Sequence, residues 1–495
     1  MTSRARIPGQ GVDKDQLLAT METFRKGDAS WRSGRTFSMV YFAGEEHLAF
    51  LKKAHNLFFS ENGLNPVAFR SLQRMEREVV QMTASMLNGP PSAVGTMTSG
   101  GTESLLLAVK TYRDRARAEK PWIKHPEIVA PTTIHVAFDK ACHYFDVTLR
   151  HAPLADDYRG DVEAMRSLIN RNTILLAASA PQYPHGVIDP IEDVAALALE
   201  HKLPMHVDAC VGGFILPWIE KAGFSLPKFD FRVDGVTSMS ADVHKYGFAA
   251  KGASVIVYRD MSYLRHQFFA ATDWPGGIYI SPTIPGTRPG GAIAAAWASL
   301  MAMGEDGFVA QARGAMEAAR KLREGIEAID GLCVLGEPAA TIVTYGSNDK
   351  RVNVFAVADQ LQDRGWNVDR QQMPTSIHCT VTGHHLDVID EYLRDLRAAV
   401  AYVIAHPEVR SRGNAAMYGM IAKIPFRGMV KKSAMQVLES MYGTEGGFDP
   451  DRPGSASTGL MGKLMDKYGG AALGLIERLE SVRDEVTKRT RGRRR

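Results

Sequence analysis

Short apolar runs alternate with amphipathic stretches between residues 69 and 259. The runs predict strands at Glu127–Ala130, Ile174–Ser179, Pro204–Asp208, Gly235–Ser240 and Ser254–Tyr258. Apolar residues at helical spacing predict helices at Gly101–Arg117, Val162–Arg171 and Ile191–His201. This alternation is typical of an α/β fold, in which helices cover both faces of a mostly parallel sheet. Ligands of such sheets bind at the carboxyl ends of the strands.

The pattern changes at Gly286–Gly291, a glycine-rich turn before a helical stretch at Ala292–Met303. From residue 306 a smaller α+β domain is expected, with helices at Phe308–Ile329, Val354–Arg364 and Leu386–Ile404 and a strand at Thr341–Tyr345. Nearer the N-terminus, a helix is expected at Gly44–Phe59. We therefore divide the chain into an N-terminal arm (1–68), a large α/β domain (69–305), a small α+β domain (306–442), and a C-terminal helical segment with a basic tail (443–495).

Composition predicts a soluble, cytoplasmic protein. A hydrophobic content of 45% and a charged content of 23% are ordinary for a globular chain. The four cysteines have no paired spacing, which favours reduced thiols over a disulfide framework or a zinc knuckle. The polar N-terminus lacks the apolar core of a signal peptide, and no apolar run reaches the length of about 18 residues that a membrane span needs.

Positive charge gathers at the C-terminus. The net charge is +4, and six of the eight residues from Lys488 to Arg495 are basic. Such a run is usually a solvated tail, so binding of nucleic acid or of an anionic membrane surface is the less favoured interpretation. The His384-His385 pair, which starts a predicted helix, is also expected in solvent.

Lys245 and Asp208 carry the strongest chemical signal. Lys245 directly follows His244, and Asp208 ends the apolar run that contains His206. An enzyme that uses pyridoxal 5′-phosphate needs a lysine amine to form a Schiff base with the cofactor. It also needs a carboxylate that keeps the pyridine nitrogen protonated, so that the ring accepts electrons. The alternative for Lys245 is a surface lysine, since lysines are rarely buried without a partner.

A glycine-rich turn, Thr98–Ser104, precedes the first predicted helix of the large domain. Its backbone amides, its hydroxyls and the N-terminus of that helix together suit a cofactor phosphate. The alternative is a helix cap, with a hydroxyl of the turn as the capping group. A phosphate site is favoured because Asp208 and Lys245, later in the chain, are also expected at the ends of strands, where ligands of such sheets bind.

Three more residues fit the cofactor. His135 follows a predicted strand and is placed to stack on a pyridine ring, with the small residue Ala209 on the opposite face. His244 is placed to donate to the phosphate. A surface-loop histidine is the alternative for His135, and it would be preferred if His135 stood alone.

His206 and Asp208 alternate along one predicted strand and share a face, so they offer a second candidate chemistry. With His135 and His143 they form a conceivable metal site for a hydrolase. That interpretation leaves the glycine-rich turn and the lysine without a role, so no metal is expected.

Together these motifs resemble those of the sphingosine-1-phosphate lyases, fold-type-I pyridoxal-phosphate enzymes related to glutamate decarboxylase. The resemblance runs from Thr36 to Tyr442 and is carried by Thr98–Ser104, His135, Pro184–Asp189, His206–Gly213, Ser240–Gly247 and Ser281–Gly291. It implies a large domain with a mostly parallel seven-stranded sheet, a smaller C-terminal α+β domain and a homodimer with shared active sites. Eukaryotic members carry an N-terminal membrane anchor that is missing here, so the chain is similar to a soluble bacterial-type member.

The resemblance also implies a role for each matching residue. The residues implied to bind the cofactor are Gly101, Thr102, His135, Asp208, Ala209, Ser240, His244, Lys245 and, from the second subunit, Thr287. Those implied to take part in catalysis are Lys245, Asp208, Tyr183 and Tyr41. Tyr41 matches a tyrosine that reaches into the partner subunit's site, and Tyr41 and Lys251 are implied to bind the substrate.

One position departs from the family. Its members usually carry a histidine after Asn-Pro and one apolar residue, and that histidine contacts the substrate phosphate. Here the run is Asn65-Pro66-Val67-Ala68, and the following loop is shorter. Alanine cannot supply that contact, so the departure concerns the substrate head group and leaves the cofactor chemistry intact.

The implied reaction breaks the Cα–Cβ bond of a lipid amine to give a long-chain aldehyde and phosphoethanolamine. A base removes the proton of the β-hydroxyl, and the carbanion left on Cα is delocalised into the cofactor ring. Tyr183, Tyr41 and Lys245 are the candidates for that base. A decarboxylase that acts on an amino acid is the alternative, since loss of CO2 leaves the same carbanion.

Overall fold

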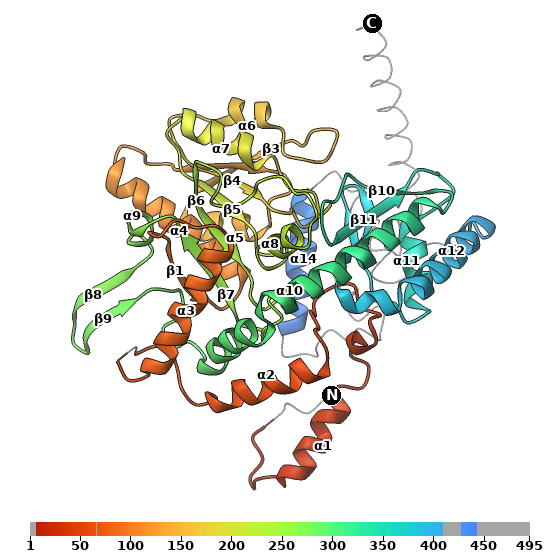
Figure 1. The fold of residues 1–495 in the computed structure, drawn as a ribbon, viewed down its shortest axis with the longest axis horizontal. Helices are drawn as coiled ribbons and strands as arrows, with labels where there is room; N and C mark the ends of the chain where they lie inside the picture. Colours follow the sequence, from red (N-terminus) through yellow and green to blue (C-terminus); the bar gives the residue numbers. More distant parts are fainter. Residues whose placement is uncertain (1–5, 66, 409–426, 443–495) are drawn as a thin grey trace, which may run out of the picture. The chain divides into compact units, whose positions relative to one another are not determined.

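The structure is a computed structural model, and it describes residues 6–65, 67–408 and 427–442 (Figure 1). The expected C-terminal segment and basic tail, 443–495, lie outside the described residues. The chain forms two compact units. Of the described residues, the larger unit holds those within 30–371 and 376–406, and the smaller holds 6–29, Gln372–Thr375, 407–408 and 427–442.

A seven-stranded sheet lies at the centre of the larger unit, with strand order β1-β7-β6-β5-β4-β2-β3. Strand β7 is antiparallel to β1 and β6, and the remaining neighbours are parallel. The strands are β1 Val94–Thr98, β2 Glu127–Pro131, β3 Thr148–Ala152, β4 Thr173–Ser179, β5 Met205–Asp208, β6 Val236–Ala241 and β7 Ser254–Tyr258. The predicted α/β fold with a mostly parallel seven-stranded sheet is therefore confirmed.

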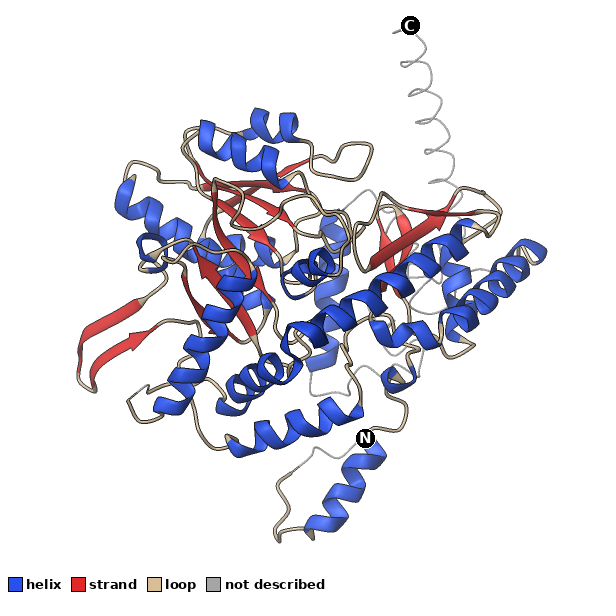
Figure 2. Ribbon diagram, in the orientation of Figure 1, coloured by secondary structure: helices blue, strands red, loops and turns tan. Residues whose placement is uncertain are grey.

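Helices cover both faces of this sheet because successive strand residues point to opposite sides. Leu175 and Ala177 of β4 join a buried cluster with α4 and α5, whereas Leu176 and Ala178 join a second cluster with α3, α7, α8 and α10. Figure 2 shows the strands of the central sheet with helices around them. These helices and their neighbours are α2 Glu45–Leu57, α3 Arg70–Met86, α4 Gly101–Glu119, α5 Ala137–Phe145, α6 Val162–Leu168, α7 Ile191–Glu200, α8 Leu216–Lys221 and α9 Met261–Leu264.

Helix α10 spans Gly290–Glu327 and bends at Gly304, whose φ of 59° lies in the left-handed region. Two separate helices were expected here; they are joined across this bend because glycine adopts a positive φ at little cost. Before α10, β8 (Phe269–Trp274) and β9 (Gly277–Ser281) form a hairpin. The hairpin was not predicted from sequence, since nearly all of its side chains are exposed or half-buried and its strands carry no clean alternation.

A second, four-stranded sheet follows, with strand order β10-β11-β13-β12. Its strands are β10 Leu332–Val334, β11 Ile342–Ser347, β12 Asp369–Gln372 and β13 Thr375–Thr380, and the helices of this part of the chain are α11 Val354–Gln362 and α12 Ile389–Ala405. Short 3₁₀ turns form at η1 Trp31–Ser33, at η2 Gly212–Phe214 after β5, and at η3 Gly383–Asp387 after β13. An N-terminal segment joins this sheet, because Thr36 bridges Asn367 and the Thr380 N–H donates to the Phe37 carbonyl at 2.7 Å.

His385 is buried, which corrects the prediction that it lies in solvent. Its Nδ1 accepts from the Thr382 N–H at 2.9 Å, and its Nε2 lies 3.0 Å from the Thr36 carbonyl. Its ring stacks on Phe37 with centroids 4.5 Å apart. The histidine therefore fixes the segment that leads from Thr36 toward Tyr41.

The smaller unit contains α1 (Lys14–Phe24) and α14 (Arg427–Tyr442). Asp13 caps α1 by accepting from the Asp15 and Gln16 N–H groups. Among the residues that the structure describes, no helix is both long and apolar enough to cross a bilayer.

Candidate active site

The ends of several strands bring the predicted cofactor residues together. Strand β5 ends at Asp208, which pairs with Ser240 of the parallel strand β6. His244 and Lys245 follow β6 by a short turn. The glycine-rich turn after β1 meets this loop, since a Cβ on Gly100 would lie 3.4 Å from Cε1 of His244. Asp208, the glycine-rich turn and Lys245 thus share one edge of the sheet.

Lys245 forms an ion pair with Asp242, a residue that the sequence analysis did not single out. Its Nζ lies 2.9 Å from Oδ2 of Asp242, and Nε2 of His244 lies 3.6 Å from the same oxygen. Burial alone would lower the pKa of Lys245, but Asp242 and Tyr41 raise it above its ordinary value. Burial raises the pKa of Asp242, yet the charge of Lys245, with a smaller contribution from His244, lowers the pKa of this carboxyl below its ordinary value. Burial lowers the pKa of His244 itself. Lys245 is therefore held as an ammonium.

Asp208 belongs to a buried chain of polar groups. Its Oδ1 accepts from the Cys210 N–H at 3.0 Å and lies 3.5 Å from Oγ of Ser240. That hydroxyl is 3.3 Å from Nε2 of His206, whose Nδ1 is 2.8 Å from Oγ of Ser238. Burial lowers the pKa of His206 to about 4, so its ring is neutral. Within the described residues the bonds to Asp208 all end on Oδ1, which leaves Oδ2 for a ligand.

The glycine-rich turn is closely packed against the loop after β6. A Cβ on Gly101 would lie 2.8 Å from Oδ2 of Asp242, so no larger residue fits without a shift. Glu103 fixes the turn, because its Oε2 accepts from the N–H and the hydroxyl of Ser99 at 2.7 and 2.6 Å. Its Oε1 accepts from the Ile284 N–H at 3.0 Å. The first amides of α4 are thereby positioned for an anion.

Tyr41 lies near Lys245 of its own chain. Its ring packs edge-on against Tyr246 with centroids 4.8 Å apart, and Nζ of Lys251 lies 5.3 Å from its ring centre. Burial raises the pKa of Tyr41 to about 12, and the Lys245 charge opposes that rise. The expectation that Tyr41 reaches into the partner subunit's site stays a prediction. Within one chain, the segment before Tyr41 is bound to the four-stranded sheet.

Tyr183 follows β4 and contacts two residues of the four-stranded sheet. Its hydroxyl donates to Oδ2 of Asp369 at 3.2 Å, and its ring stacks on His378 with centroids 4.3 Å apart. Burial and Asp369 raise the pKa of Tyr183 above its ordinary value, whereas Lys245 partly offsets this. The four-stranded sheet therefore contributes to the same site as the large sheet.

Comparison with known proteins places this site in a family. A family model described as the pyridoxal-dependent decarboxylase conserved domain matches residues 30–346. The sphingosine-1-phosphate lyase of Arabidopsis thaliana is 44% identical over 444 residues, which are 88% of this chain and 80% of that protein. The chain belongs to the sphingosine-1-phosphate lyase family. It is a pyridoxal-phosphate-dependent lyase, and its cofactor is pyridoxal 5′-phosphate.

Solved structures agree with this membership. The sphingosine-1-phosphate lyase of Burkholderia pseudomallei K96243 matches with a TM-score of 0.82 at 36% identity, over 89% of this chain and 98% of that one. Glutamate decarboxylase of Lactobacillus brevis shares the fold, with a TM-score of 0.72 at 20% identity over 82% of this chain and 96% of that one.

The residues present fit this cofactor of the lyase family. Gly101 leaves the amides of α4 accessible where a side chain would not fit, and Asp208 offers an oxygen to the pyridine N–H. Lys245 supplies the amine, and His244 lies beside the glycine-rich turn as a donor. A phosphate site, a carboxylate and an amine on one sheet edge match the three polar parts of pyridoxal phosphate.

Other predicted residues occupy the surrounding loops. Ala209 is fully buried, whereas Thr102, His135 and Thr287 are exposed. Nδ1 of His135 accepts from the Ala137 N–H at 3.2 Å, which orients its ring at the start of α5. Thr287 lies in the loop between β9 and α10.

The competing metal site is not formed. Within the described ranges, no group of three His, Cys, Asp or Glu side chains could hold a metal ion. His206 is instead occupied by the hydroxyls of Ser238 and Ser240.

Asp242, Glu103 and Asp369 are residues of the candidate site that sequence reasoning missed. Asp242 lies three positions before Lys245, and this spacing on a turn was an available signal. Glu103 stands in the first turn of α4, where its return to Ser99 resembles a capping box. Asp369 carried no such signal, because it meets Tyr183 across 186 positions of chain.

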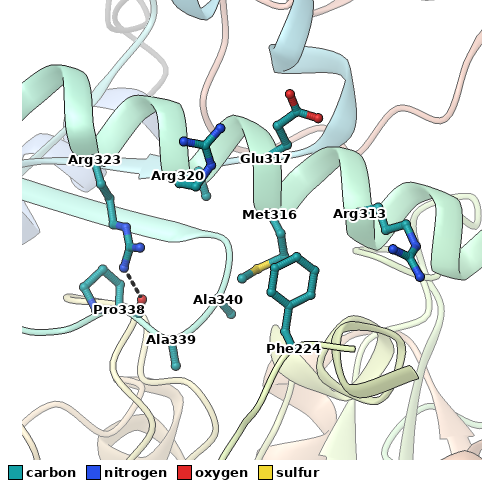
Figure 3. A pocket seen from close by; sticks show the side chains of 10 residues that line it. Phe224, Arg313, Met316, Glu317, Arg320, Arg323, Pro338, Ala339 and Ala340 are labelled. Atoms are coloured by element: carbon teal, nitrogen blue, oxygen red, sulfur yellow. Dashed lines mark hydrogen bonds between the residues drawn. The ribbon is translucent and has the colours of Figure 1, made fainter. Parts of the chain in front are cut away.

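A cavity of about 550 Å³ is formed by other elements (Figure 3). Phe224, Met316, Pro338, Ala339 and Ala340 give it an apolar lining beside Arg313, Arg320 and Arg323. Arg323 donates to the Pro338 carbonyl at 3.1 Å, and Arg320 pairs with Glu324 at 2.8 Å. None of the cofactor residues lines this cavity, so we assign it no part in the chemistry.

Proposed function

We propose that this chain cleaves the Cα–Cβ bond of a phosphorylated long-chain base of the sphingosine 1-phosphate type. The products are a fatty aldehyde and phosphoethanolamine. The observation that carries the proposal is the likeness to the Arabidopsis lyase, at 44% identity over 88% of this chain and 80% of that protein. An amino-acid decarboxylase is the second candidate, supported by the family model over residues 30–346. The likeness to the lyases extends beyond that model, which favours the lyase.

Each site residue receives a role in this proposal. Lys245 attaches the cofactor and Asp208 pairs with the pyridine nitrogen. When bound, pyridoxal phosphate supplies the electron sink that stabilises the carbanion. Gly101, Thr102 and His244 hold its phosphate, while His135 and Ala209 flank its ring and Ser240 supports Asp208. Tyr41, Tyr183 and Lys251 surround the substrate, and Lys251 offers a cation to the substrate phosphate.

The active form in this proposal is a cytoplasmic homodimer in which Thr287 enters the partner subunit's site. Support comes from the β8–β9 hairpin, where Trp274, Ile278 and Ile280 are exposed and offer an apolar surface to a second copy. Residues 69–305 act as the cofactor-binding domain, and residues 306–442 act as the small domain that completes the site. Sedimentation of the purified protein at twice the mass of one chain would support this assembly.

Product analysis tests the reaction itself. The purified holoenzyme is incubated with sphingosine 1-phosphate, and a long-chain aldehyde is expected together with phosphoethanolamine. Amino acids such as glutamate, tyrosine and aspartate are tested in parallel for CO2. Release of CO2 without any aldehyde would replace the lyase proposal by the decarboxylase one.

A further inference from the structure

Cleavage beside a hydroxyl-bearing carbon needs a group that takes the hydroxyl proton. We propose that Tyr183 takes this proton and that Asp369, on β12, acts as its positioning residue by accepting the phenol proton in the same step. This inference rests on the proposed lyase function. It identifies the base for that reaction and assigns the four-stranded sheet a part in it.

The hydrogen bond between the two side chains has a defined direction. A carboxylate only accepts, so the single proton of the Tyr183 hydroxyl is donated to Oδ2 of Asp369, at 3.2 Å. The lone pairs of the phenol oxygen then remain for a substrate hydroxyl. Because its only hydroxyl proton points at Asp369, Tyr183 can only accept a hydrogen bond from the substrate. A phenol without such a partner could donate to the substrate instead.

His378 holds the ring in that orientation. It is fully buried beneath Tyr183, with the two ring centroids 4.3 Å apart. Its Nε2 lies 2.9 Å from Oγ1 of Thr380, and its Nδ1 lies 3.2 Å from Nε2 of Gln371. Burial lowers the pKa of His378 to about 4, so it is a neutral platform that adds no competing charge.

The proton steps balance. The substrate O–H bond breaks and a bond from that proton to the Tyr183 oxygen forms, while the Tyr183 O–H bond breaks and Asp369 becomes protonated. The electron pair of the substrate O–H bond becomes the carbonyl bond of the aldehyde, and the pair of the broken C–C bond stays on the amine-bearing carbon. That carbon later takes up one proton, so the proton lent to Asp369 is recovered and no oxidant or reductant is required.

The surroundings of Asp369 suit a proton acceptor. Burial raises the pKa of this carboxyl, and the Ser38 and Tyr183 hydroxyls and the Arg370 guanidinium lower it again in part. The charge of Asp369 also contributes to the raised pKa of Tyr41, from the N-terminal segment. Because the relay needs an ionised Asp369, turnover should fall as the pH drops through this raised pKa.

Kinetics of the holoenzyme with sphingosine 1-phosphate test the relay. Asp369→Asn keeps the size of the side chain and its hydrogen-bond acceptor, but the amide cannot take up a proton. This variant therefore separates a role in proton transfer from a role in orienting the Tyr183 ring. We expect kcat to fall about 100-fold in Asp369→Asn and in Tyr183→Phe, with little change in KM. The double variant should be no slower than the slower single variant, since the two residues act as one unit. In the wild type, kcat should fall at low pH as Asp369 becomes protonated. This fall should be absent in Asp369→Asn.

Asp363→Asn is the matched control, because Asp363 is an exposed carboxylate just after α11 in the same domain. It should keep wild-type kcat, and the cofactor absorbance of every variant should match that of the wild type. If Asp369→Asn retains wild-type kcat and its fall at low pH, the relay is wrong while the lyase proposal stands. If the wild type itself forms no aldehyde, the lyase proposal fails and the relay fails with it.

Discussion

Nζ of Lys245 lies 2.9 Å from Oδ2 of Asp242. The lysine proposed to attach the cofactor therefore forms an ion pair with a carboxylate three positions earlier in the chain. Asp242 is almost completely buried, and the Lys245 side chain keeps 25% of its surface exposed. In the cofactor-free protein, the attraction between the two charges therefore offsets the free-energy cost of burying each of them. Replacing one partner leaves the second partly desolvated without compensation.

Asp242→Asn should destabilise the cofactor-free protein by about 1–3 kcal/mol at pH 7, less than for a fully buried pair because Lys245 retains some solvent contact. The folded pKa of Asp242 is lowered, so its contribution is present above the ordinary carboxyl pKa of about 4 and is lost as the pH falls through the lowered value. The folded pKa of Lys245 is raised, so its contribution is present below about pH 10 and is lost as the pH rises through the raised value.

Chemical unfolding at several pH values measures this effect. The difference in unfolding free energy between wild type and Asp242→Asn should be level near neutral pH and should shrink in strong acid and strong base. Glu163→Gln is the control, since Glu163 forms a surface pair with Arg166 at 3.4 Å and 80% of its side chain is exposed. A difference that does not vary with pH would show that Asp242 stabilises the fold by packing and not by charge.

The attachment residue gives a second prediction. Lys245 lies at the sheet edge with Asp208, whereas Lys251 is exposed and contacts Tyr41. Borohydride treatment of the yellow holoenzyme should fix the cofactor on Lys245, as found by mass spectrometry of peptides. Lys245→Ala should abolish turnover, while Lys251→Ala should keep the cofactor and weaken substrate binding. Labelling at Lys251 in the wild type would overturn the assignment.

Sequence patterns predicted the elements that local chemistry specifies. Strand β7 was predicted at Ser254–Tyr258, its observed bounds, because a run of apolar, β-branched residues ends at polar neighbours. Asp208 and Lys245 were placed at the ends of parallel strands, and parallel strands align their carboxyl ends. These inferences need no knowledge of distant contacts.

Distant contacts account for what sequence patterns did not predict. His385 was expected in solvent, but Phe37 and the Thr36 carbonyl, about 350 positions earlier, enclose it. The pairing of Thr36 with Asn367, which binds the segment before Tyr41 to a distant part of the same chain, was not predicted either. Neither pairing leaves a local periodic signal, because the contacting residues lie in separate elements.

The position of Tyr41 gives a third prediction. Tyr41 contacts Lys251 and Tyr246 of its own chain, so a chain carrying Tyr41→Phe and a chain carrying Lys245→Ala cannot form a complete site together. Each variant is expected to lose activity alone, and mixing the two should restore none. Thr287, in contrast, is proposed to enter the partner subunit's site, where Thr287→Glu should repel the cofactor phosphate.

A mixture of Thr287→Glu and Lys245→Ala chains should therefore regain activity. Random exchange makes about half of the dimers hybrid, each with one complete site, so about a quarter of wild-type activity is expected. Exchange is verified with chains of different mass. Recovery in the Tyr41→Phe mixture instead would show that Tyr41 serves the partner subunit in the active dimer.

The last prediction follows from Ala68, at the position where the resemblance to the family implies a histidine. A phosphate monoester carries close to two negative charges and needs several donors to offset its lost hydration. Ala68 offers only its backbone N–H, and that group donates to Oδ1 of Asn65 at 3.2 Å. Lys251 and Tyr41 remain as donors, so this chain should bind phosphorylated long-chain bases more weakly than relatives with the histidine.

Ala68→His should restore a charged hydrogen bond worth about 1.5–3 kcal/mol, and KM for sphingosine 1-phosphate should fall about tenfold or more. Its kcat should change little, because the phosphate is remote from the breaking bond and binds equally in ground and transition states. Ala68→Leu is the matched control, since it adds bulk without a donor and should not lower KM. If the wild type already matches the KM of relatives with the histidine, and Ala68→His leaves KM unchanged, another residue of this chain supplies the missing donor.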